Sequence, residues 1–139
     1  MAASRQRSTY VLVFDGGSRG NPGRSYGSFR MERRGGPRSR PVRLDFGSGT
    51  NNQAEYQALI AGLHALLDHL RADGVVSQQV QLEVRGDSLL VLRQVEGVWK
   101  TKEPRLRPLR DEAAELLGRF GRVELRHQPR RRSVAILGH

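Results

Sequence analysis

Three acidic residues occupy positions from which their carboxylates could converge on one metal ion. Asp15 follows the apolar run 10–14, and Asp87 follows the strand-like run 80–86. Glu55 stands near the beginning of a segment with helical periodicity. Hard cations such as Mg²⁺ take oxygen ligands, and carboxylates from separate segments can supply them. The residue types and their settings therefore predict a metal site built from these three side chains.

Each acid also has a structural explanation that needs no metal. Asp15 precedes a glycine, as in an ordinary turn. Asn52 and Glu55 have the spacing of a helix capping box, and Asp87 stands where the N-cap of the next helix would fall. The joint pattern favours the metal site, because three carboxylates gathered beyond the ends of strands would repel one another without a cation.

Hydrophobic periodicity and turn residues predict the elements that must position these acids. Five segments have the composition of strands: residues 9–15, 26–33, 41–48, 79–86 and 121–126. Four segments predict helices: residues 52–71, 88–95, 104–118 and a last turn at 133–137. The glycine-rich segment 16–23 predicts a turn, and the segment Arg34–Pro37 predicts the turn of a hairpin.

The order of these elements predicts an α/β protein. The first three strands follow one another through turns and should be antiparallel, whereas a strand–helix–strand unit requires a right-handed crossover between parallel strands. The expected fold is a mixed five-stranded sheet with helices on both faces. Acids at the carboxyl ends of its strands then lie where sites form in open sheets.

The chain of 139 residues has the size of one domain and carries a net charge of +10, from 24 Lys and Arg against 14 Asp and Glu. A small domain this basic usually binds a polyanion such as nucleic acid, although a charged surface also serves solubility alone. It has no cysteine, and no apolar run reaches the roughly 18 residues of a membrane span. Residues 1–8 are expected to form a disordered basic tail without the apolar core of a secretory signal, so we expect a cytoplasmic protein.

Three segments together resemble the motifs of the type 1 ribonuclease H family. Residues 15–23 (DGGSRGNPG) are similar to its first motif, residues 50–59 (TNNQAEYQAL) to its second and residues 86–88 (GDS) to its third. The resemblance implies a ribonuclease H-like fold, with a ribonuclease H domain over residues 9–139. The short link before residue 104 is similar to compact members that lack a long basic insertion.

The resemblance implies cleavage of the RNA strand in RNA–DNA hybrids with two Mg²⁺ or Mn²⁺ ions, leaving 5′-phosphate and 3′-hydroxyl ends. Asp15 would bridge both ions, and Glu55 and Asp87 would ligate one of them. His127 matches a mobile histidine that aids water activation or product release, and an imidazole suits proton transfer at neutral pH. We expect the hybrid as the partner of a monomer, with no protein partner and no membrane.

The same resemblance assigns substrate contacts to a larger set of residues. Amide side chains can donate to and accept from a 2′-hydroxyl, the group that separates RNA from DNA, although turn and cap chemistry would also explain the asparagines. Exposed glycine backbone would let a strand approach closely. Trp99 could stack on a sugar or base or belong to the core or a lid, and the arginine run from Arg130 could contact phosphates or be merely solvated. The assigned residues are Gly16, Gly17, Asn21, Thr50, Asn51, Asn52, Ser88, Trp99 and Arg130.

The last motif of the family is incomplete in this chain. The family pattern places a fourth acid ten residues after the histidine, and that position here is Leu137. Three hypotheses compete: the three acids suffice with water in the vacant place, His139 or the terminal carboxylate substitutes, or the protein binds hybrids or double-stranded RNA without cutting. A histidine ligand would favour Mn²⁺ over Mg²⁺, because imidazole is softer than carboxylate. A related nuclease of the same fold acting on other substrates is a further alternative.

Overall fold

A computed structural model describes residues 8–138 of the chain. The expected basic tail lies outside the described residues apart from Ser8, which opens the first strand, and His139 lies outside them as well.

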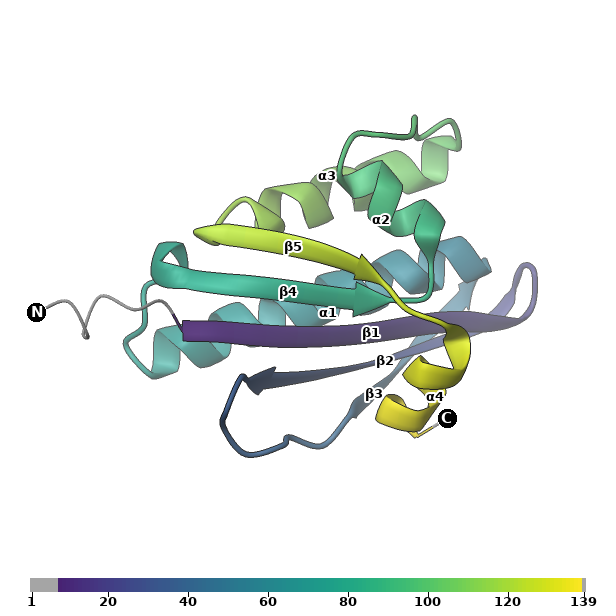
Figure 1. Cartoon of the computed structure of the whole chain (residues 1–139). Helices are drawn as coiled ribbons and strands as arrows, with labels where there is room; N and C mark the ends of the chain where they lie inside the picture. The colour runs from purple at the N-terminus through teal and green to yellow at the C-terminus, as the bar shows by residue number, and fades with distance from the viewer. Residues whose placement is uncertain (1–7, 139) are drawn as a thin grey trace, which may run out of the picture.

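The structure is built on a five-stranded sheet with the strand order β3-β2-β1-β4-β5 (Figure 1). Its strands are β1 (Ser8–Gly20), β2 (Gly23–Arg33), β3 (Val42–Gly49), β4 (Val80–Gly86) and β5 (Arg122–His127). β1 pairs antiparallel with β2, and β2 pairs antiparallel with β3. β4 runs parallel to both β1 and β5. The predicted mixed sheet is confirmed.

Helices cover both faces of this sheet, as the sequence predicted (Figure 1). The helices are α1 (Asn51–Ala72), α2 (Leu89–Val95), α3 (Arg107–Leu117) and α4 (Arg130–Leu137), with the 3₁₀ turns η2 (Ser77–Gln79) and η3 (Pro104–Leu106). Side chains alternate along β1, so Leu12 and Phe14 belong to the core under α1, whereas Val11 and Val13 pack against Leu137 of α4. α1 and α3 therefore lie on one face, and α4 lies on the other.

The larger core lies between the sheet and α1. Leu59, Leu63 and Leu66 of α1 are completely buried, together with Leu12 and Phe14 of β1. Burying each such side chain stabilises the fold by roughly 1.5–3 kcal/mol. The leucine spacing that predicted this helix is the stripe that it turns toward the sheet.

The glycine-rich segment 16–23 is mostly strand, so the prediction of a turn over its whole length was wrong. β1 continues to Gly20 and pairs with β2 residue by residue, ending with Gly20 opposite Gly23. Asn21 and Pro22 alone form the turn, and a cis peptide bond joins them. The ends of β1 and β2 therefore form an antiparallel ribbon that extends beyond Asp15, and β3 pairs along the other side of β2 (Figure 1).

The last helix also differs from its prediction. α4 begins at Arg130, three residues before the expected helical turn at 133–137. Its N-cap is Pro129, whose fixed φ suits the entry to a helix. The arginine run therefore forms the first turn of a helix.

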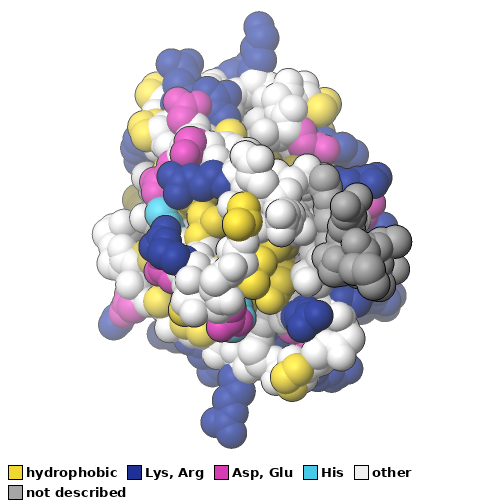
Figure 2. All heavy atoms as spheres, turned by 90° about the vertical axis from the view of Figure 1, so that its left-hand side faces the viewer, with side chains coloured by type: hydrophobic (Ala, Val, Ile, Leu, Met, Phe, Trp, Pro, Cys, Tyr) yellow, Lys and Arg dark blue, Asp and Glu magenta, His cyan; other side chains and the backbone are white. Residues whose placement is uncertain are grey.

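The end of the molecule at which β1 begins has a surface of mixed charge. Apolar side chains lie there among both basic and acidic ones (Figure 2). A hollow of about 390 Å³ at this end is lined by Tyr10, Met31, Arg33 and His69, among others. Tyr10 and Asp15 are five residues apart on one strand, which separates this hollow from the acids by roughly 16 Å.

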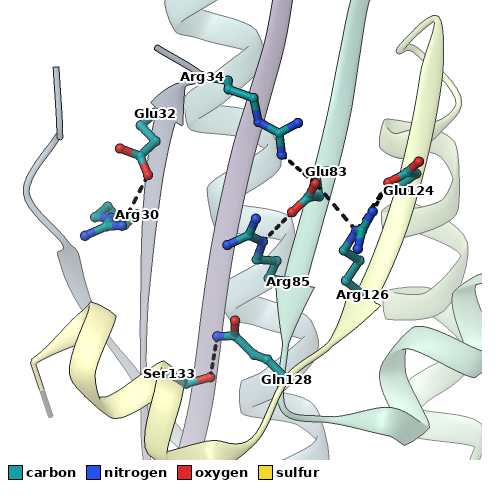
Figure 3. Close-up of polar contacts among 9 residues, drawn as sticks. All are labelled: Arg30, Glu32, Arg34, Glu83, Arg85, Glu124, Arg126, Gln128 and Ser133. Atoms are coloured by element: carbon teal, nitrogen blue, oxygen red, sulfur yellow. Dashed lines mark hydrogen bonds and ion pairs between the residues drawn. The ribbon is translucent and has the colours of Figure 1, made fainter. Parts of the chain in front are cut away.

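Charged side chains cover the part of the sheet face beside α4 (Figure 3). The register places like charges opposite each other, with Arg85 beside Arg126 and Glu83 beside Glu124. Ion pairs between rows compensate for this repulsion. Glu83 lies 2.7 Å from Arg34 and 3.5 Å from Arg126, and it also pairs with Arg85.

Glu83 is the buried centre of this network, because its side chain is only 5% exposed. Burial opposes its ionisation, but hydrogen bonds from Arg85 and Arg34 keep the pKa of Glu83 below its ordinary value. A lowered pKa means that the stabilisation by Glu83 is fully present at neutral pH and is lost as the pH falls through that pKa.

We expect Glu83→Gln to lower the free energy of unfolding by about 1–3 kcal/mol at pH 7, because the arginines lose their shared buried anion. Glu124→Gln is the matched control, since its carboxylate side chain is 36% exposed, and it should cost less than about 1 kcal/mol. Urea unfolding followed by circular dichroism measures both variants. Equal losses would show that burial does not distinguish the two acids.

Candidate active site

Asp15 and Asp87 lie side by side because their strands are parallel neighbours. The register pairs Val13 with Arg85, so two further residues along each chain bring the aspartates to the same level. Asp15 lies within β1 and is 2% exposed, and Asp87 is the first residue after β4. The predicted meeting of these two acids at the carboxyl side of the parallel pair is confirmed.

Glu55 is brought to these aspartates by the first turn of α1. Thr50 is the N-cap of this helix: its hydroxyl accepts the Gln53 amide at 3.2 Å, and the Gln53 side chain accepts the Thr50 amide at 2.8 Å. Asn52 and Glu55 therefore do not form the capping box that was the structural alternative for Glu55. Because Gln53 takes that role, the carboxylate of Glu55 is left to join the other acids.

A glycine at position 16 lets α1 approach β1 this closely. A Cβ atom on Gly16 would lie 2.4 Å from the carbonyl group of Ala54, the residue before Glu55. Gly16 and Gly17 are both buried, so the expectation of exposed glycine backbone was wrong. A larger residue at position 16 would push the start of α1, and with it Glu55, away from Asp15.

The three carboxylates form a compact cluster. One oxygen from each of Asp15, Glu55 and Asp87 lies within 4.8 Å of the others. Burial, and then repulsion from Asp15 and Asp87, raises the pKa of Glu55 to about 9. Burial and then Asp15 likewise raise the pKa of Asp87 to about 6, against the opposing charge of Arg130.

This cluster fits a hard divalent cation. Glu55 Oε2 and Asp87 Oδ2 are buried and have no hydrogen-bond partner within residues 8–138. Closely spaced carboxylate oxygens are the ligands that such a cation takes, and its charge would remove the repulsion that raises both pKa values. The three acids can therefore bind a metal ion.

Glu55 and Asp87 open into a hollow of about 430 Å³. Ser88 on its wall is the N-cap of α2, since its hydroxyl accepts the amide of Val91 at 3.3 Å. Asp87 is therefore not the cap, contrary to the structural alternative considered for it. The hollow is lined by Gly16, Gly17, Ser18, Tyr26, Asn51, Asn52, Glu55, Asp87, Ser88 and Arg130.

Asn21 and Asn51 join the β1–β2 ribbon to the start of α1. The side-chain oxygen of Asn51 accepts the amide of Ser18 at 2.7 Å, and that of Asn21 accepts the amide of Asn51 at 3.1 Å. Both residues are exposed. Their oxygens hold the two segments together, while their side-chain nitrogens remain available to a ligand.

The remaining predicted residues lie at different distances from the acids. His127 ends β5, and its Nε2 lies 3.2 Å from the carbonyl oxygen of Asp87. Trp99 is 45% exposed on the loop after α2 and does not line the hollow. The structure therefore brings His127 to the acids and leaves Trp99 apart from them.

The position expected for a fourth acid holds a core residue. Leu137 is 0% exposed and packs against Val11 and Val13 of β1. No acid occurs in α4. Leu137 thus attaches α4 to the sheet, and three carboxylates make up the acid cluster within the part of the chain that the structure describes.

Two residues of the hollow, Ser18 and Tyr26, were not identified from the sequence. Tyr26 pairs with Gly17 across the ribbon, and a Cβ atom on Gly17 would lie 2.9 Å from the Tyr26 hydroxyl. The register of β1 and β2 would have revealed this neighbour. The turn expected over residues 16–23 excluded that pairing, and so concealed it.

The sheet order and the acid cluster define a class of α/β protein with a site suited to a divalent metal. The family model described as "Reverse transcriptase-like" matches residues 44–136. Ribonuclease HI of Halobacterium salinarum is 42% identical over 117 residues, which are 84% of this chain and 55% of that protein. Bifunctional protein Rv2228c of Mycobacterium tuberculosis is 37% identical over 125 residues, 89% of this chain and 32% of that protein. The chain thus spans about half or less of the length of these curated relatives.

Solved structures agree over nearly the whole chain. The RNase H1 of Halobacterium salinarum has a TM-score of 0.77 at 39% identity, covering 90% of this chain and 89% of that one. LC11-RNase H1 in complex with an RNA/DNA hybrid has a TM-score of 0.79 at 32% identity, covering 91% and 90%. The chain belongs to the type 1 ribonuclease H family.

None of the helices in residues 8–138 has the length and apolar character needed to cross a membrane.

We expect the metal-free protein to lose stability as the pH rises from about 5 to about 9. The unfolded chain releases the Glu55 proton near 4.5, whereas the folded protein holds it up to a pKa of about 9. Above pH 5 the folded state therefore binds more protons than the unfolded state, and the free energy of unfolding falls as the pH rises. Melting temperatures in EDTA across this range measure the effect.

Glu55→Gln is the variant that tests the cause, because it removes this proton and should flatten the dependence on pH. Mg²⁺ or Mn²⁺ should raise the melting temperature of the parent protein most at high pH, since the cation binds the deprotonated carboxylates. An equal slope in EDTA for the parent and the variant would exclude Glu55 as its source.

Proposed function

We propose that this chain is an endoribonuclease that cleaves the RNA strand of RNA–DNA hybrids, leaving 5′-phosphate and 3′-hydroxyl ends. The observation that carries the proposal is the convergence of three carboxylates within 4.8 Å at a hollow walled by asparagines. Membership of the type 1 ribonuclease H family supports it, and so does the similarity to LC11-RNase H1, which was solved in complex with an RNA/DNA hybrid.

Asp15, Glu55 and Asp87 would hold Mg²⁺ or Mn²⁺, with two ions per site. Such ions lower the pKa of an attacking water and stabilise charge on the leaving oxygen. The protein's part is to hold the carboxylates close together, which the packing of Gly16 against Ala54 supports, whereas the charge of the ions would favour their ionised form. In our proposal Asp15 would contribute ligand atoms to both ions.

Recognition of RNA would come from the wall of the hollow. The side-chain nitrogens of Asn21, Asn51 and Asn52 are suited to donate to a 2′-hydroxyl, the group absent from DNA. Thr50 would hold a phosphate of the DNA strand beside its capping role. Gly16, Gly17 and Ser88 would contact the strands closely, Arg130 would bind a phosphate, and Trp99 would stack on a sugar or base outside the hollow.

His127 is proposed as the group that moves a proton during water activation or product release. Its Nε2 lies 3.2 Å from the carbonyl oxygen of Asp87, which places the imidazole beside the acids. Its exposure leaves the ring room to change orientation and reach solvent. His139 remains a proposed extra ligand outside the described residues.

The absence of an acid at position 137 supports a second candidate function. With a buried leucine in place of a fourth carboxylate, the protein could bind hybrids or double-stranded RNA and cut them slowly or not at all. Binding would then be sensitive to salt, because the basic surface releases counterions from nucleic acid. We further propose that residues 9–139 act as a monomeric, cytoplasmic ribonuclease H domain.

We expect wild-type protein with Mg²⁺ or Mn²⁺ to cut the RNA strand of a hybrid labelled on both strands and to leave the DNA strand intact. Asp15→Asn should lower the rate by more than about 100-fold, because it removes the central ligand. Asp68→Asn, an exposed acid on α1 that pairs with Arg71, is the matched control and should keep the parental rate. Gel electrophoresis of both labels measures cleavage.

The same assay separates the two candidate functions. Tight, salt-sensitive binding of hybrid without cleavage in either metal would favour the binding protein. Cleavage of double-stranded DNA at the same rate would contradict the role of the asparagines in reading the 2′-hydroxyl.

A further inference from the structure

A second hollow adjoins Asp15, between the β1–β2 ribbon and α4. Its volume is about 310 Å³, and its wall consists of Asp15, Arg19, Tyr26, Arg130 and Val134. Arg130 and Tyr26 also line the hollow that holds the other acids. The two hollows are therefore neighbours that share side chains, and the proposed function gives no role to Arg19 or Tyr26 of the second one.

The charges of the two arginines of this second hollow are only partly compensated, because Arg130 acts on Asp87 and Asp15 lies in the same wall. Within residues 8–138, neither Arg19 nor Arg130 has a side-chain hydrogen bond or an ion pair. Arg24, which pairs with Arg19 across the ribbon, differs because it contacts Asp45 at 2.9 Å. Arg126, near Arg130 in the chain, is likewise occupied by Glu124 at 3.0 Å. Two guanidinium groups that make no ion pair within residues 8–138 thus lie in the wall beside Asp15.

The beginning of α4 adds to this charge. Its N-cap Pro129 supplies no side-chain hydrogen bond, and its first turn contains Arg130, Arg131 and Arg132 but no acid. The amide end of a helix favours anions, so three cations there are unfavourably placed. An anion bound beside Arg130 would relieve this repulsion and could also accept from the unpaired amides.

Tyr26 places a hydroxyl group between the two hollows. The hydroxyl lies so close to Gly17 that a Cβ there would approach it to 2.9 Å. Tyr26 is partly exposed, and a phenol can donate to a phosphate oxygen. The second hollow therefore offers two guanidinium groups as donors for a phosphate, with Tyr26 in the wall that it shares with the first hollow.

We propose that this second hollow is a phosphate subsite that holds one phosphodiester of the RNA strand next to the cleavage site. The inference rests on the proposed function, which brings the RNA strand to Asp15. A phosphate one step along the same strand would then lie beside Asp15, within reach of Arg19 and Arg130. Guanidinium groups bind phosphate oxygens through paired hydrogen bonds, which suits a fixed position on a strand.

The subsite also compensates for the carboxylate in its wall. Asp15 alone would repel a phosphate, but Arg19 and Arg130 together outweigh its charge. The arginines thereby supply positive charge beside the reacting strand in a chain whose fourth acid is replaced by Leu137.

Binding of a fluorescent RNA–DNA hybrid in EDTA tests the proposal without requiring cleavage. Anisotropy titrations over a range of NaCl concentrations compare Arg19→Ala, Arg130→Ala and the double variant with the parent protein. Arg122→Ala, an exposed arginine at the start of β5, is the matched control for loss of one charge. Each subsite variant should raise Kd about tenfold at low salt, and Arg122→Ala should leave it within about twofold.

The double variant distinguishes a shared phosphate from two separate contacts. If both arginines hold one phosphate, the slope of log Kd against log salt should fall by about one contact in the double variant. A fall of about two contacts, or single variants that behave like Arg122→Ala, would overturn the subsite.

Neutral methylphosphonate linkages placed one at a time assign the strand. One position in the RNA strand should weaken binding to the parent protein and leave the double variant unaffected. If only DNA-strand positions behave this way, the assignment to RNA is wrong. If the parent protein does not cleave the hybrid but these differences in binding are still observed, the proposed function is refuted and the subsite is not.

Discussion

The close contact between β1 and the first turn of α1 is the constraint on which the site depends. Gly16 has no side chain, and any Cβ atom there would collide with the carbonyl group of Ala54. The contact brings Glu55, in the first turn of α1, to Asp15 of β1. The parallel pairing of β1 with β4 brings Asp87 to the same place. Three acids are thereby held together in a buried position where they repel one another, and a cation would relieve that repulsion.

The register of the strands also determines where the excess of arginine can act. On the sheet face beside α4, arginines and glutamates face each other in rows and largely neutralise one another, with Glu83 at the centre (Figure 3). Beside the acids this compensation ends, since Arg19 and Arg130 lack such partners within the described residues. Part of the net charge of +10 is therefore concentrated beside the acids, where the proposed function places a nucleic-acid backbone.

Much of the fold was predictable because strong local patterns agreed with the tertiary structure. The leucine stripe of α1 and the apolar run of β1 both mark elements that occur as expected. The ends of elements were less predictable. The glycines after Asp15 resemble a turn in isolation, yet pairing with β2 and packing under α1 hold them in an extended strand. Thr50 rather than Asn52 is the N-cap of α1, so Gln53 rather than Glu55 completes the capping box.

The sequence by itself determined the family, the order of the elements and the three acids, because residue type and spacing carry that information along the chain. It also revealed that a leucine stands where a fourth acid was expected. Only the tertiary structure decided that Leu137 packs α4 against β1 and that Tyr26 faces Gly17. It also decided that Arg19 and Arg130 line one hollow with Asp15. These relations depend on strand register and helix position, which join residues far apart in the sequence and are set by packing of the whole chain.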